Sequence, residues 1–285
     1  MKKLLCFLLF YPFYIWCELP QPPATAPEQK ESINTADIKL YLDGDEIIEL
    51  QAGGDTVLAL LREEMTGQPK GTAIIIPDWS QTATSPRGIQ HLRVALNHIG
   101  WTTMTLSVPD PLHVLDVKVK PPQGESKVQF LPPPSSYPLT DEQLSTYKTS
   151  LYVRIDAALK KAFTYPGFFV LIGQGTNGAF INELIKEDKI QEIDGVVMLS
   201  AYMPDPTRQK QLAQAIAEHE IPVLDIYQSY DNAKVLAELS LRRDLTKKKY
   251  KAQYRQRELF GYTNYAFQNE RLFKEVYGWF TFLGM

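Results

Sequence analysis

The residues best placed to do chemistry lie in one glycine-rich segment near the middle of the 285-residue chain, Gly173-Gln174-Gly175-Thr176-Asn177-Gly178. An apolar run with aromatic and β-branched residues precedes the segment, and apolar residues at helical spacing follow it. This pattern predicts a buried strand, a sharp turn and a helix. Such a unit positions either a cofactor phosphate or a nucleophilic side chain, and here the residue at the apex, Gly175, has no side chain with which to attack.

The spacing Gly173-x-Gly175-x-x-Gly178 matches the fingerprint of dinucleotide-binding turns. That fingerprint needs an acidic residue about 20 positions later, at the end of the next strand, to bind the ribose. The next predicted strand, 195–200, ends without an acid, and Asp194 precedes it. The fingerprint also usually opens its fold, whereas strands and helices come before it here. Dinucleotide binding therefore stays only a second alternative.

The segment is also similar to a nucleophile elbow, the G-x-S-x-G turn in which a serine sits in strained backbone between a strand and a helix. Gly175 takes the place of the serine and tolerates the strained φ at no cost. Asn177 takes the place of the last glycine, while Gly178 and Ala179 are small enough for close helix packing. The plain alternative is a glycine turn with a structural role only.

A hydrolytic triad follows the chain order nucleophile, acid, histidine. Asp231 comes just after the predicted strand 221–227 and is the candidate acid, although it could instead cap the helix predicted from Asn232. All four histidines precede it in the sequence, so none stands where the base belongs. Weak candidates for a non-standard catalytic set are Asp78, Ser80, Ser200 and Asp231. No spacing typical of metal ligands occurs, and we expect neither a metal site nor a cofactor.

The N-terminus, Met1–Cys17, has a short basic start and an apolar stretch, which is typical of a cleaved secretory signal peptide. Both cysteines lie in it, so the mature chain contains no disulfide. We expect a periplasmic protein with a flexible, Pro-rich leader over 18–36 and one domain over 37–285. The net charge of −3 gives no indication of a nucleic-acid partner.

Strands alternate with helices along the domain, which predicts an α/β fold with a mostly parallel sheet. We expect strands at 38–42, 46–50, 56–61, 71–77, 101–109, 168–172, 195–200, 221–227 and 250–260. Helices are expected at 89–99, 140–163, 179–185, 207–219, 232–243 and 269–282, and a Pro-rich insertion at about 110–138. The basic run Arg242–Lys251 is either a solvated helix face or a surface for contact with a membrane.

Several segments, taken in their order, resemble an exported proteobacterial α/β-hydrolase-like family of unknown function. They are 74–80, 98–101, 106–111, 171–175, 197–202, 222–227 and 254–257. The resemblance implies an α/β-hydrolase-like sheet with helices on both faces and a degenerate elbow. Because the nucleophile and the base are absent, we expect a pseudoenzyme, a non-catalytic pseudo-hydrolase that binds a small ligand or a protein of the cell envelope. The alternative is a hydrolase of esterase or amidase type with non-standard residues.

Overall fold

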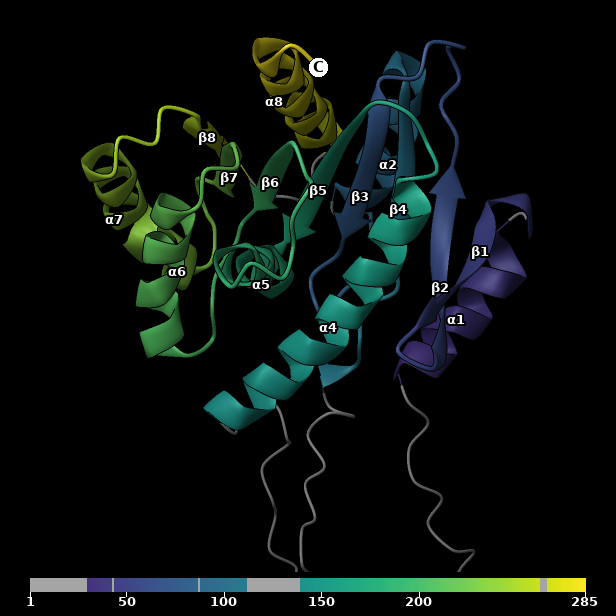
Figure 1. The fold of residues 1–285 in the computed structure, drawn as a ribbon, viewed down its shortest axis with the longest axis horizontal. Coiled ribbons are helices and arrows are strands. Elements are labelled where there is room, and N and C mark those ends of the chain that lie inside the picture. The colour runs from purple at the N-terminus through teal and green to yellow at the C-terminus, as the bar shows by residue number, and fades with distance from the viewer. Residues whose placement is uncertain (1–29, 43, 87, 112–138, 262–265) are drawn as a thin grey trace, which may run out of the picture.

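A single eight-stranded sheet forms the centre of the protein in the computed structural model, which describes residues 30–42, 44–86, 88–111, 139–261 and 266–285 (Figure 1). The strand order is β1-β2-β4-β3-β5-β6-β7-β8. The strands are β1 (Ile47–Ala52), β2 (Asp55–Arg62), β3 (Gly71–Ile76), β4 (Trp101–Leu106), β5 (Phe168–Gln174), β6 (Gly195–Leu199), β7 (Val223–Gln228) and β8 (Tyr254–Leu259).

The sheet is mixed but mostly parallel, as the alternation of elements predicts. β1 and β2 form an antiparallel hairpin, and β2 is also antiparallel to β4. All pairs from β4 to β8 are parallel. The central strands β3, β4 and β6 are buried along their whole length, since helices cover both of their faces. The pairing of Ile76 with Gly173 brings the carboxyl ends of β3 and β5 side by side.

Helices form a layer on each face of the sheet (Figure 1). Residues of α4 (Asp141–Ala162), α5 (Gly175–Lys186) and α6 (Pro206–Glu218) join one apolar core with one face. Residues of α2 (Ile89–Ala95) and α8 (Ala266–Leu283) join a second core with the other face. The helix α7 (Ala233–Lys248) packs beside α6 at the end of the sheet that carries β7 and β8.

The predicted strand at 38–42 is wrong, because these residues continue a helix, α1 (Lys30–Tyr41). Ile38 packs against Leu58 and Leu60 of β2, so the apolar residue serves helix packing. The second half of the predicted leader, residues 30–36, is helical as well. The first turn of α1 is held by a bidentate ion pair between Glu31 and Arg154 of α4. The predicted signal peptide, residues 18–29 of the leader and residues 112–138 of the insertion lie outside the described residues.

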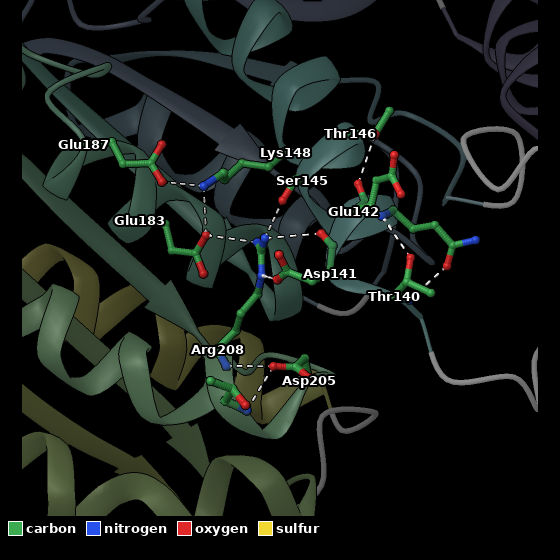
Figure 2. Close-up of polar contacts among 12 residues, drawn as sticks. Thr140, Asp141, Glu142, Ser145, Thr146, Lys148, Glu183, Glu187, Asp205 and Arg208 are labelled. Carbon is green, nitrogen blue, oxygen red and sulfur yellow. Dashed lines mark hydrogen bonds and ion pairs between the residues drawn. The ribbon is translucent and has the colours of Figure 1, made fainter.

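The start of α4 is a capping box, with reciprocal hydrogen bonds between Thr140 and Gln143. Nearby, an ion-pair network ties α4 to α5 and α6 (Figure 2). The Arg208 guanidinium of α6 contacts Asp141 of α4 and Glu183 of α5. Lys148 of α4 binds the same Glu183 at 3.2 Å. This network fixes the position of α5, the helix that begins at the glycine-rich turn.

Candidate functional site

The glycine-rich turn has the backbone of a nucleophile elbow. Gly175 follows β5 directly, begins α5 and has a φ of 55°, in the left-handed region that disfavours side chains. A Cβ atom on Gly173 would lie 2.6 Å from the Cα of Gly178, so the strand and the helix cross in close contact. The left-handed φ and the close crossing therefore favour glycine at these positions, which fits both an elbow and a purely structural turn.

The carboxyl group of Asp78 fills the space that an elbow nucleophile would occupy. A Cβ atom at position 175 would lie 2.5 Å from the Cγ of Asp78 and closer still to Oδ1. The same Oδ1 accepts a hydrogen bond of 2.8 Å from the backbone N–H of Thr176. In a nucleophile elbow, the N–H of the residue after the nucleophile belongs to the oxyanion hole. Asp78, from the loop after β3, thus occupies both the nucleophile space and an oxyanion donor.

The loop that carries Asp78 is pinned from several sides. Asn177 donates from Nδ2 to the carbonyl oxygen of Pro77 at 2.7 Å, and its Oδ1 accepts from the Tyr147 hydroxyl of α4 at 3.0 Å. Ser80 donates to Asp78 Oδ2 at 3.0 Å. On the outer side, Lys30 Nζ of α1 donates to the carbonyl oxygen of Ser80. The position of the carboxylate is consequently set by α1, α4 and α5 together.

Burial changes the acidity of two groups at this site. Burial raises the pKa of the Asp78 carboxyl, while the hydrogen bonds from the Thr176 N–H and from Ser80 oppose the rise. Burial also raises the pKa of the Tyr202 hydroxyl, and the nearby Asp78 carboxylate adds to that effect. Tyr202 therefore stays protonated and can donate a hydrogen bond.

A second pair of candidates, Ser200 and Asp231, meets across the ends of β6 and β7. Ser200 Oγ donates to Asp231 Oδ2 at 2.5 Å. The backbone N–H of Gln228 donates to the same oxygen, and the N–H of Asn232 donates to Oδ1. Asn232, not Asp231, caps α7 by accepting from the N–H of Lys234. Asp231 thus orders its own turn and holds Ser200.

The four catalytic candidates line one open cleft of about 300 Å³ at the carboxyl edge of the sheet, together with Gln174 and Gly175. Five further lining residues are absent from the sequence-based prediction: Gln81, Tyr202, Gln228, Tyr230 and Asn232. Four of these five follow the ends of β6 and β7 or lie at them, and in a parallel sheet such positions meet at one edge. That rule was a usable signal for all four.

No histidine among the described residues lines this cleft. His219 follows α6 and binds Asn182 and Lys251, and His91 of α2 lies 3.4 Å from Glu270 of α8. His113 lies outside the described residues. Within the described part of the chain, no cluster of three or more His, Cys, Asp or Glu side chains is arranged to hold a metal ion.

The basic run Arg242–Lys251 is only partly a surface. Arg242 is fully buried and pairs with the equally buried Asp225 of β7, and it also donates to the carbonyl oxygen of Ala201. The prediction that Arg242 belongs to a membrane-contacting patch is therefore wrong, because its charge is neutralised inside the protein. The exposed cations of the run are Arg243, Lys247, Lys248 and Lys249, and their contact with a membrane surface stays a prediction.

A family model spans residues 12–281, and its description reads protein of unknown function (DUF3530). The chain belongs to the DUF3530 family. Among curated proteins, none matches this member of the family. In the described part of this DUF3530 chain, the helices are all too short or too polar to cross a membrane.

Solved structures show that this DUF3530 protein has the α/β-hydrolase fold. Est1E from Butyrivibrio proteoclasticus is 14% identical, with a TM-score of 0.57, and the match covers 84% of this chain and 98% of Est1E. The esterase domain of a Rhodothermus marinus protein is 12% identical, with a TM-score of 0.55 over 82% and 96% of the two chains. Dienelactone hydrolase from Anabaena variabilis is 13% identical, with a TM-score of 0.56 over 82% and 95%. At such identities the likeness concerns the fold alone.

Proposed function

We propose that the protein is an exported, non-catalytic member of the α/β-hydrolase fold that binds a small polar ligand of the cell envelope in the cleft at Gly175. One observation carries this proposal. The Asp78 carboxyl group stands in the space of the missing nucleophile and takes the N–H of Thr176. Acyl transfer needs both that space and that donor, so their occupation argues against turnover.

The remaining features of the cleft support binding. Its volume of about 300 Å³ suits a small molecule, and serine, glutamine, tyrosine and carboxylate side chains converge on it. A pyrophosphate would have to approach the N-terminus of α5 against the Asp78 carboxylate, which disfavours the dinucleotide alternative. Undetectable binding of NAD or NADP in calorimetry is therefore the expected result.

Hydrolysis with non-standard residues is the second candidate function, favoured by the meeting of all four candidates in one cleft. In that case Asp78 would act as a carboxylate nucleophile or base from the place of the absent side chain.

The two functions are separated by assaying the purified protein and its Asp78→Asn and Ser200→Ala variants with p-nitrophenyl acetate and p-nitrophenyl butyrate. The non-catalytic proposal expects the rate of buffer alone for all three proteins. Turnover by the natural protein that is lost on Asp78→Asn would overturn it in favour of the hydrolase. Amino-terminal sequencing of the protein from the periplasmic fraction tests export, for which a start near Glu18 is expected.

A further inference from the structure

The cleft is unevenly charged. Two carboxylates, Asp78 and Asp231, line it, and no lysine, arginine or histidine among the described residues does. Two lysines beside the cleft donate to backbone carbonyl oxygens instead, Lys30 to that of Ser80 and Lys234 to that of Pro204. A concave site with one sign of charge concentrates ligands of the opposite sign. The cleft therefore selects against anions and favours a cation.

The wall of the cleft also holds an unsatisfied acceptor. Gln228 at the end of β7 is only 9% exposed, and its Oε1 has no hydrogen-bond partner among the described residues. A buried acceptor without a partner costs about 1–3 kcal/mol, which a ligand donor would recover once the Gln228 side chain turned its covered Oε1 toward the cleft. The backbone N–H of Gln228 donates to Asp231, so the unpaired oxygen and one carboxylate belong to the same strand end. Two acceptors at one wall call for a group with several donors.

Aromatic rings complete the surroundings. Tyr202 and Tyr230 line the cleft, and Tyr230 is 60% exposed. The ring of Phe260, also exposed, lies 6.5 Å from that of Tyr230. The faces of such rings attract ammonium groups at about 0.5–1 kcal/mol in exposed positions. Aromatic faces beside carboxylates are thus suited to a positively charged amine.

We propose that the cleft binds a small ligand through a primary ammonium group, which is placed at the wall formed by Asp231 and Gln228, with its remaining part against Tyr202 and Tyr230. An ammonium offers three donors and no acceptor, which matches the surplus of acceptors at this wall. The inference rests on the proposed binding function and adds the chemical class of the ligand.

The test compares three pairs of compounds that differ by amine against hydroxyl: glucosamine and glucose, ethanolamine and ethylene glycol, and 1,4-diaminobutane and 1,4-butanediol. Binding to the purified full-length mature protein is measured by calorimetry at pH 6.5 and low salt. We expect the amine of at least one pair to bind about tenfold or more tightly than its hydroxyl partner. Equal affinities within every pair, or no amine binding up to about 10 mM, would overturn the inference.

Variants locate the bound group. Asp231→Asn should weaken amine binding about tenfold or more, and the control Asp244→Asn, on the exposed side of α7, should leave it unchanged. Since Asp231 also orders a turn, Gln228→Met provides a second variant. It removes an unpaired buried acceptor, so the fold should tolerate it while amine affinity falls. Amine binding that survives both substitutions would refute this wall as the site.

Equal binding of amines and alcohols leaves a non-catalytic binding protein with another ligand class. Ester turnover that depends on Asp78 removes the non-catalytic proposal, whatever the amines do.

Discussion

Replacing Gly175 with alanine should destabilise the protein, and the cause should be traceable to Asp78. The new Cβ atom would lie within 2.5 Å of Asp78 Cγ and would displace the carboxylate from the N–H of Thr176. Loss of a hydrogen bond to a charged group costs about 1.5–3 kcal/mol. The φ of 55° adds about 1–2 kcal/mol for a residue with a side chain. The expected loss in the free energy of unfolding is therefore about 3–5 kcal/mol.

A double-mutant cycle with Asp78→Gly isolates the steric part of this effect. Asp78→Gly alone should cost about 2–4 kcal/mol, because it removes the same hydrogen bond and adds chain entropy to the unfolded state. In that background, however, the space is empty, and Gly175→Ala should cost only the about 1–2 kcal/mol of its backbone conformation. The coupling between the two positions should thus be about 2 kcal/mol.

The assay is equilibrium unfolding in guanidinium chloride, followed by circular dichroism, on the four proteins of the cycle. Gly278→Ala is the matched control, since a Cβ there meets nothing within 4 Å and the residue lies inside α8. It should be neutral or stabilising by up to about 1 kcal/mol. Strictly additive losses at positions 78 and 175 would refute the conclusion that Asp78 fills the elbow.

Three further perturbations follow from buried polar groups. Burial lowers the pKa of His219 to about 3, so between pH 6.5 and 3 the unfolded chain binds a proton that the folded protein does not. The free energy of unfolding should therefore decrease as the pH is lowered through this range, by up to about 1.4 kcal/mol per pH unit. A His219→Gln variant that keeps the whole slope in unfolding titrations would contradict this. Arg242→Met leaves the charge of Asp225 buried and should cost about 3–5 kcal/mol in denaturant unfolding, whereas its exposed neighbour Arg243→Met should stay within about 0.5 kcal/mol; similar losses for both would count against the buried pair. Asn177→Ala removes the hydrogen bond that Asn177 donates to the loop carrying Asp78 and should cost about 1–3 kcal/mol, with faster amide hydrogen exchange at residues 78–81. Unchanged exchange would show that the loop is held elsewhere.

The order of the elements was predictable from the sequence because local patterns decide it. Seven of the eight described strands coincide with a predicted apolar segment to within a few residues, and β8 lies inside the longer predicted range 250–260. The failure at 38–42 has a physical cause: a five-residue alternation is too short to separate a strand from a helix in which Ile38 is the one buried residue. The prediction of a basic surface over 242–251 failed at Arg242 for a similar reason. The sequence does not show which cation of the run pairs with a buried carboxylate, here Asp225.

For the cleft, the sequence by itself determined the strand–turn–helix unit, the missing serine at Gly175 and the absence of a histidine after Asp231. Those are statements about residue types and chain order. Only the tertiary structure decided what fills the vacated position, because Asp78 is far from Gly175 along the chain and reaches it through the parallel pairing of β3 with β5. It also decided that Ser200 binds Asp231 and that Gln228 and Tyr230 share their cleft. Side chains from separate strand ends converge only when the sheet forms, and no local pattern specifies that geometry.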